Sequence, residues 1–301
     1  MAKTPVITLD LTFQGRKQAI AAYLVPHSSG AILVECGSGS TLPALQTALA
    51  EEGYSPADVT HVLLTHIHLD HAGAAGWLAR QGADVYVHPV GAPHMLNPEK
   101  LLASASRIYG DRMDSLWGGF LSVPEDRLNV PEDAAEIVIG NLRFVTVNTP
   151  GHAYHHYAYL FEDICFSGDI GGVRIPGFPY MRLPMPPPEL HLEKWRESVQ
   201  RLRGEKFNRI APTHFGIFDD PYWQLNELEK SLDAVSRWLD KVMPDDLPIE
   251  ELREKFSTWM DEQALISGLS QEVTKVYEVA NPVGMSADGL RRYWKKFRKA
   301  D

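Results

Sequence analysis

The feature that most constrains the fold is a short segment in which four metal-ligand side chains follow an apolar run. His66, His68, Asp70 and His71 come at the end of an expected strand over Val59 to Thr65. Alternate side chains of a strand project to one side, so His66 and His68 should point together, while Asp70 and His71 lie in a turn that opens a helix. Burying these groups without a cation would be costly, and imidazole and carboxylate suit zinc, iron and manganese. The segment predicts a metal site at a bend between a strand and a helix.

The apolar pattern of the whole chain alternates between strand and helix periods. This alternation indicates a layered α/β or α+β architecture. Residues 91–128 are expected to form a helical insert, and residues 171–188 are rich in Pro and Gly, which predicts a loop that could cover a site. We expect a first domain at 1–220 and a helical C-terminal extension at 221–301. Strands are expected near 6–11, 19–25, 31–35, 59–65, 83–88, 137–139, 144–147, 157–161 and 207–211, and helices near 42–53, 71–80 and 189–203.

Composition and charge indicate the broad class of protein and the partners to expect. Hydrophobic residues make up 44% and charged residues 23%, which is typical of a soluble globular protein. The N-terminus has no long apolar stretch behind a basic start, so we expect no membrane span and a cytoplasmic location. Cys36 and Cys165 are interpreted as reduced packing residues. The net charge of −10 opposes a phosphate backbone, so we expect no nucleic-acid partner.

Three later segments complete a recognisable pattern. They are Thr149-Pro150-Gly151-His152, Phe166-Ser167-Gly168-Asp169 and Pro212-Thr213-His214-Phe215-Gly216. Together with His66-x-His68-x-Asp70-His71 they resemble the motifs of the metallo-β-lactamase superfamily, in the same order. The resemblance covers about residues 6 to 220 and implies a four-layer αβ/βα sandwich. The stretches 106–111 and 152–156 resemble a bacterial and archaeal group of hydrolases with a helical C-terminal extension.

The resemblance also implies a ligand set for two divalent metal ions. Zinc is expected, with iron or manganese as alternatives. Two such ions, about 3.5–4 Å apart, can share a water whose pKa falls toward about 7, so a metal-bound hydroxide is the implied nucleophile. Asp70 is expected to orient that water or receive its proton. The implied ligands are His66, His68 and His152 for one metal, Asp70, His71 and His214 for the other, and Asp169 as the bridge.

Further residues are expected to support the site or contact the substrate. The family usually has Asp-x-Gly near the end of an early strand, where this chain has Glu35-Cys36-Gly37; we expect Glu35 to accept hydrogen bonds from the metal loop. His155 and His156 follow His152 closely enough to lie behind the ligands or against the substrate. The isolated His61, His88 and His94 are interpreted as packed or surface residues. An apolar cleft is expected between the C-terminal helices, the insert (Tyr109, Trp117, Phe120) and the Pro-rich loop (Tyr180, Met181, Arg182).

The predicted function is metal-dependent hydrolysis of an ester, thioester or lactone in a small-molecule substrate. Three alternatives stay open: a phosphodiesterase, a mono-iron persulfide dioxygenase and a ligand-binding protein with little turnover. A homodimer also stays open. In the basic segment 290–299 we expect Tyr293, Trp294 and Phe297 to pack on the domain while the lysines face water. The alternatives are contact with an anionic thioester or with a membrane surface.

Overall fold

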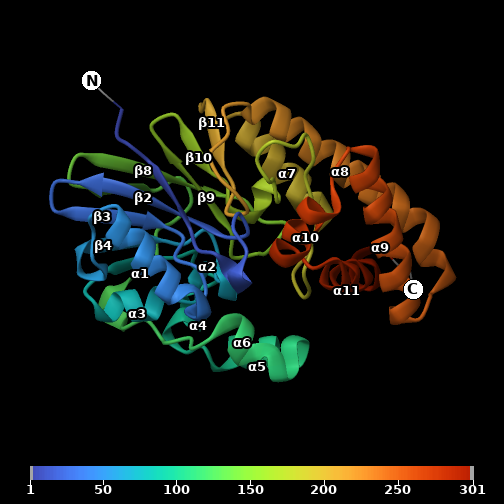
Figure 1. Cartoon of the computed structure of the whole chain (residues 1–301), viewed down its shortest axis with the longest axis horizontal. Helices are drawn as coiled ribbons and strands as arrows, with labels where there is room; N and C mark the ends of the chain where they lie inside the picture. Colours follow the sequence, from blue (N-terminus) through green and yellow to red (C-terminus); the bar gives the residue numbers. More distant parts are fainter. Residues whose placement is uncertain (1–2, 299–301) are drawn as a thin grey trace.

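Two β-sheets form the centre of the molecule in the computed structural model, which describes residues 3–298 (Figure 1). In the first sheet, ordered β1-β2-β3-β4-β5-β6, the first two pairings are antiparallel and the others parallel. In the second sheet, ordered β11-β10-β9-β8-β7, only the β10–β11 pairing is parallel. The strands are β1 (Ile7–Asp10), β2 (Ala21–His27), β3 (Gly30–Val34), β4 (Val59–Leu63), β5 (Asp84–Tyr86), β6 (Leu128–Asn129), β7 (Glu136–Ile139), β8 (Leu142–Asn148), β9 (Tyr157–Phe161), β10 (Ile164–Phe166) and β11 (Arg209–Ala211).

The two faces of the first sheet pack into different cores. Along β2, Tyr23 and Val25 belong to the core between the sheets, whereas Ala22 and Leu24 belong to the core under the outer helices. This alternation follows from the strand period, which sends successive side chains to opposite faces. Helices α1 (Leu42–Glu51) and α3 (Ala75–Arg80) cover the first sheet, and α7 (Leu192–Arg203) packs on the second. The expected α+β layered sandwich is confirmed.

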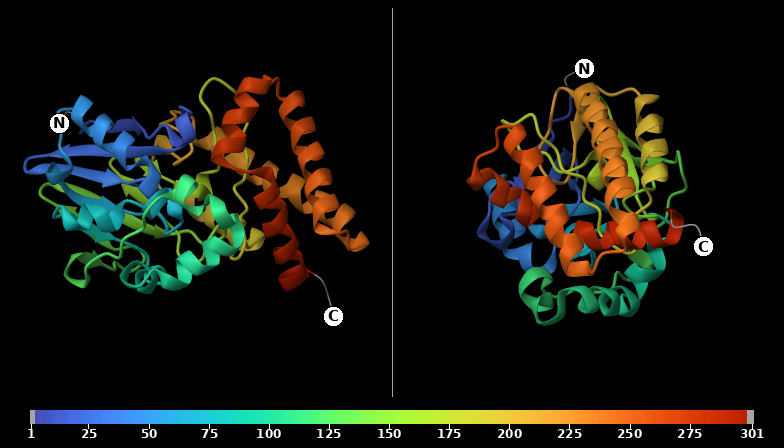
Figure 2. Two further views of the ribbon diagram at one scale, coloured as in Figure 1. Left: turned by 60° about the horizontal axis from the view of Figure 1, so that its bottom comes forward. Right: turned by 90° about the vertical axis from the view of Figure 1, so that its right-hand side faces the viewer.

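Four further helices form the C-terminal region, gathered at one end of the sandwich (Figure 2). They are α8 (Pro221–Val242), α9 (Ile249–Ile266), α10 (Gln271–Ala280) and α11 (Val283–Tyr293). Side chains such as Leu228, Phe256 and Leu290 belong to the core that also fills the space between the sheets, so these helices share one apolar core with the sandwich. In the region from residue 3 to residue 298, no helix combines the length and the apolar character needed to cross a membrane.

The last helical residues pack largely as expected. Tyr293 is buried, and Trp294 packs against the same core. Phe297 is only partly covered: it is 37% exposed, with its ring centroid 4.3 Å from that of His191.

The helical insert between β5 and β6 lies below the sandwich in Figure 1. It contains α4 (Ala92–Leu96), α5 (Glu99–Tyr109) and α6 (Met113–Trp117). It is tied to the first part of the chain by a stacked pair of rings, Phe13 and Trp117, whose centroids are 5.4 Å apart. Residues of the insert and His68 line the same cavity, so the insert lies beside the edge of the sandwich at which the strands β4, β8 and β10 end.

The segment with the first four ligands differs in detail from the expectation. The strand β4 ends at Leu63 rather than Thr65, and the expected helix 71–80 is divided into α2 (Leu69–Ala72) and α3. A Cβ at Gly73, between the two helices, would lie 2.6 Å from the Cα of Ser38 and 2.7 Å from the backbone nitrogen of Gly39. The backbone of residues 38–39 thus approaches so closely that only glycine fits, and the helix is interrupted there.

Candidate metal centre

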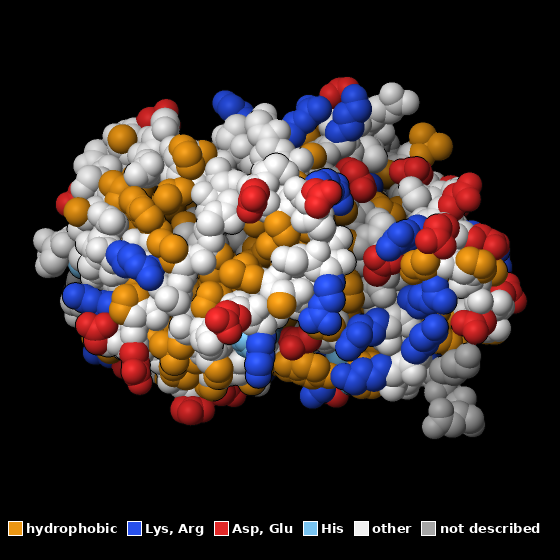
Figure 3. Space-filling view, turned by 90° about the horizontal axis from the view of Figure 1, so that it is seen from below, with side chains coloured by type: hydrophobic (Ala, Val, Ile, Leu, Met, Phe, Trp, Pro, Cys, Tyr) orange, Lys and Arg blue, Asp and Glu red, His pale blue; other side chains and the backbone are white. Residues whose placement is uncertain are grey.

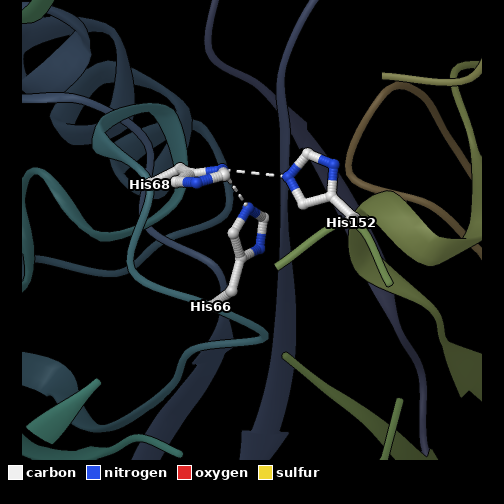
Figure 4. Close-up of side chains that lie close together, drawn as sticks. All are labelled: His66, His68 and His152. Atoms are coloured by element: carbon white, nitrogen blue, oxygen red, sulfur yellow. Dashed lines mark hydrogen bonds between the residues drawn. The ribbon is translucent and has the colours of Figure 1, made fainter. Parts of the chain in front are cut away.

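Seven side chains from four segments converge at one edge of the two sheets. His66 and His68 lie between β4 and α2, and Asp70 and His71 are in α2. The other three come from loops that follow strands: His152 after β8, Asp169 after β10 and His214 after β11. In Figure 4, the imidazoles of His66, His68 and His152 point toward one another.

Three histidines form the first set of donors. Nδ1 of His68 lies 2.9 Å from Nε2 of His66 and 2.9 Å from Nε2 of His152 (Figure 4). Oδ2 of Asp169 lies 3.3 Å from Nε2 of His152. The three imidazole nitrogens therefore lie around one position that a cation could occupy, with Asp169 beside His152.

The second set stands beside the first. Oδ2 of Asp70 lies 3.6 Å from Nε2 of His71 and 3.5 Å from Nε2 of His214. Oδ1 of Asp169 lies 3.4 Å from both of these nitrogens. Donors around a tetrahedral cation with bonds of about 2.1 Å are roughly 3.4 Å apart, so the spacing suits a metal. Asp169 offers one carboxylate oxygen to each set.

Polar atoms of this cluster that lack hydrogen-bond partners also indicate a site for a cation. Nε2 of His71 and Oδ1 of Asp169 are buried and have no hydrogen-bond partner within residues 3–298. Buried polar atoms without partners are rare and unfavourable, and a cation between them removes the penalty. The imidazole and carboxylate donors fit two divalent cations.

Hydrogen bonds behind the ligands fix which ring nitrogen is free. When Nδ1 of a histidine donates to an oxygen, Nε2 is left unprotonated and available to a metal. Such oxygens lie near Nδ1 of three ligands: His71 faces Oε1 of Glu35 at 3.1 Å, His152 faces the carbonyl of Pro184 at 2.7 Å, and His214 faces the carbonyl of Ala19 at 2.6 Å.

Burial shapes the protonation states of the first set. Burial and the nearby His71 lower the pKa of His66 well below its usual value. Burial, followed by the effect of His152, lowers the pKa of His68 to about 3. These imidazoles are therefore neutral near pH 7, which is the form that binds a metal.

In the second set, neighbouring charges outweigh the effect of burial on the pKa values. Burial alone would raise the pKa of Asp70, but His71 and His214 hold it at about 2. Burial would lower the pKa of His71, but Asp70 and Asp169 raise it well above its usual value. A cation that binds here therefore displaces a proton from His71.

Glu35 links two of the four ligand segments, those of His66–His71 and His214. It is 1% exposed and has a φ of +67°, an uncommon backbone conformation for a residue other than glycine. Its Oε1 accepts hydrogen bonds from the hydroxyls of Thr65 and Thr213 and faces Nδ1 of His71. The carboxylate thus contacts the metal loop, as expected where the family pattern has Asp.

Replacing Glu35 with Gln should weaken metal binding by about 10- to 100-fold, because the charge that orients His71 is lost while the side-chain volume is kept. A chelator competition titration measures this affinity. The exposed Glu52→Gln serves as the control and should bind metal like the unmodified protein. Equal affinity in the Glu35→Gln variant would contradict the role given to Glu35.

Three further residues that the sequence singled out lie on different sides of the metal centre. His155 lines the adjoining cavity, and its Nε2 lies 3.4 Å from Oε2 of Glu189. His156 is fully buried behind the ligands, with Nδ1 2.8 Å from the hydroxyl of Thr149. Tyr109 lines the cavity from the insert, and its hydroxyl lies 3.4 Å from Sδ of Met285.

The expectation that the Pro-rich loop walls the cleft through residues 180–182 is wrong. Tyr180 and Met181 are buried in the core, and Arg182 is 1% exposed with its guanidinium 3.4 Å from Glu278. The backbone of Arg182 pairs with that of Val173, which holds this segment inside the protein. Arg182 therefore lies behind Glu278, which itself lines the cavity.

A cavity of about 950 Å³ opens over the metal centre. His68, Asp70, His152 and Asp169 reach its surface. Its walls come from the loop before β2, the insert, residues 184–189 and the C-terminal helices. On the molecular face seen in Figure 3, apolar side chains gather in the middle, and Lys and Arg side chains lie beside them. The sequence did not indicate which residues of the C-terminal helices form this wall, because no local signal marks residues 278–288.

Comparisons with known proteins agree with this geometry. Residues 15–214 match the family model described as the metallo-beta-lactamase superfamily. A metallo-beta-lactamase fold-containing protein of Sulfurisphaera tokodaii is 30% identical over 52% of this chain and 60% of its own length. An atrochrysone carboxyl ACP thioesterase of Cryptosporiopsis is 23% identical over 67% of this chain and 51% of its own length. The chain thus spans about half to three fifths of these two relatives.

A solved structure extends the likeness beyond the residues that the family model matches. The metallo-beta-lactamase family protein of Thermus thermophilus aligns over 97% of this chain and 93% of its own, with a TM-score of 0.64 and 20% identity. At this identity the likeness concerns the fold alone, and it includes the helical C-terminal region.

Proposed function

Because the chain belongs to the metallo-β-lactamase superfamily, we propose that it is a hydrolase that uses two divalent cations to cleave a carboxyl ester, thioester or lactone. One observation carries the proposal: the two oxygens of Asp169 face two separate sets of donors at the surface of a cavity. A single-metal site would need only one such set. The same donors accept zinc, iron or manganese.

Different residues of the chain would bind the cations and accept the proton. His66, His68 and His152 would hold one cation, and His71 and His214 would hold the other with Asp70. When bound, the cations supply Lewis acidity, which polarises a carbonyl oxygen and lowers the pKa of a water. Oδ2 of Asp70 faces the two imidazoles, so its other oxygen is left to hold or accept the proton of that water.

The cavity favours a substrate with an apolar part. Phe13, Ile20 and Ile67 are buried side chains that line it, and Trp117 adds a further ring. Such walls exclude water and bind an acyl group through the hydrophobic effect. Among the relatives, the Cryptosporiopsis protein is named as an ACP thioesterase, which supports a thioester as the first substrate class to test.

A substrate panel tests the proposal. The protein is loaded with zinc, manganese or iron in turn and assayed with acyl esters, acyl thioesters, lactones and phosphodiesters. We expect metal-dependent cleavage of at least one carboxyl substrate, most readily a thioester. Cleavage of phosphodiesters alone, or no turnover with any metal, would contradict it.

A further inference from the structure

Three cationic side chains stand where the cavity meets solvent. Arg16, Lys100 and Arg112 line the cavity and are exposed, which places them at its mouth. Arg16 comes from the loop before β2, whereas Lys100 and Arg112 belong to the insert. We call these three side chains the cationic rim.

The cationic rim differs from the other charges of the cavity in having no ion-pair partner. Arg253 binds Asp288 through two hydrogen bonds of 2.8 and 2.7 Å, and Lys275 binds Glu272 at 2.6 Å. Within residues 3–298, the rim side chains form no such ion pair. Glu272 is near enough to Arg16 for the two charges to interact, but its carboxylate is already bonded to Lys275.

The acidic groups of the cavity do not neutralise the rim either. Glu189 faces Nε2 of His155 at 3.4 Å and accepts from the backbone of Tyr154 at 2.9 Å. Glu278 faces Arg182 at 3.4 Å. The positive charge at the mouth therefore remains uncompensated by the cavity itself.

Neither the helix dipole nor the net charge of the chain accounts for the positions of these three cations. Lys100 is the second residue of α5, where a positive charge opposes the helix dipole. The whole chain carries a net charge of −10, so three unpaired cations at one opening are not a result of overall composition. A mouth of this kind attracts anions and raises their local concentration.

We propose that the cationic rim is an anion-binding site for the leaving part of the substrate, and this inference rests on the proposed function. The acyl group would occupy the apolar inner cavity, and a phosphate or carboxylate on the thiol carrier would bind at the mouth. In the reaction, water adds its oxygen to the acyl carbon, the carbon–sulfur bond breaks, and a carboxylic acid and a thiol result. No oxidant or reductant is needed.

A matched series of thioesters tests the rim in the metal-loaded protein. The same butyryl group is carried by coenzyme A, which bears phosphates, by glutathione, which bears carboxylates, or by pantetheine, which is uncharged. We expect kcat/KM for a charged carrier to exceed that for pantetheine about 10-fold or more, mainly through KM. Raising the salt concentration should shrink the difference. The preferred anion identifies phosphate or carboxylate as the ligand group.

The variant with Arg16→Gln, Lys100→Gln and Arg112→Gln should lose this preference and hydrolyse all three thioesters about as well as it does the pantetheine thioester. Arg107→Gln is the matched control, because Arg107 is exposed on the same α5 helix but does not line the cavity. This control should keep the preference of the unmodified protein.

A binding measurement separates failure of the rim from failure of the proposed function. Calorimetric titration with the thioethers S-methyl-coenzyme A, S-methylglutathione and S-methylpantetheine needs no turnover. The rim is supported if one anionic thioether binds more tightly than S-methylpantetheine, and if this difference is lost in the triple variant and kept in Arg107→Gln. This result would hold even if no thioester is cleaved. Equal binding of charged and uncharged thioethers by the unmodified protein overturns the rim, whatever the protein hydrolyses.

Discussion

Replacing Asp169 with Asn is expected to lower kcat/KM by about 10³-fold. Oδ1 of Asp169 faces His71 and His214, and Oδ2 faces His152, so the substitution removes a donor oxygen from one of the two sets. Lewis-acid assistance contributes several kcal/mol to the barrier in such sites, which corresponds to a loss of this size. The variant should also retain fewer metal ions.

The Asp169→Asn measurement combines steady-state kinetics with metal content, and thermal unfolding checks that the variant is folded. The exposed Asp126→Asn is the control, since Asp126 lies outside the cavity and should leave kinetics unchanged. A folded Asp169→Asn variant that keeps both metals and activity within 10-fold would contradict the bridging role.

Replacing Asp70 with Asn should separate chemistry from binding. General acid–base groups contribute about 10²- to 10⁴-fold, so kcat is expected to fall within that range. Asn keeps the size of the Asp70 side chain and the apolar walls of the cavity are unchanged, so the affinity for a substrate analogue should change little. Steady-state kinetics and calorimetric titration with a non-hydrolysable analogue of the best substrate measure the two quantities.

The Asp70→Asn variant also distinguishes a hydrolase from a protein that merely binds its ligand. If the unmodified protein shows little turnover and the variant loses only binding, the site serves recognition rather than catalysis. Metal content must be measured in parallel, because Oδ2 of Asp70 faces His71 and His214. A variant that keeps its metals and its full kcat would remove Asp70 from the reaction.

The sequence predicted which side chains converge at the edge of the sheets, because short motifs place them at the ends of strands. His152, Asp169 and His214 each follow a strand of the second sheet, and neighbouring strands bring their ends to one edge. The layered fold was predictable for a related reason: β2 and β3 carry apolar residues on both faces, which requires a layer on each side.

Other parts of the site depend on contacts between distant segments. Tyr180 and Met181 lie in a Pro-rich stretch that predicts a loop over the site, but pairing between Val173 and Arg182 holds them in the core. The sequence does not indicate the positive φ of Glu35, because residues 31–35 have the pattern of an ordinary strand. Which side chains of α10 and α11 line the cavity likewise depends on how the C-terminal helices pack, which helical periodicity does not specify.

Metal stoichiometry is the sharpest test of the two-cation centre. The protein is saturated with zinc, freed of excess metal and analysed by inductively coupled plasma mass spectrometry, beside the variants His68→Ala and His214→Ala. We expect about two ions per chain in the unmodified protein and a loss in each variant, since each substitution removes a donor from a different set. One ion or none in the unmodified protein, or variants that bind as much metal as it does, would contradict the two-cation centre.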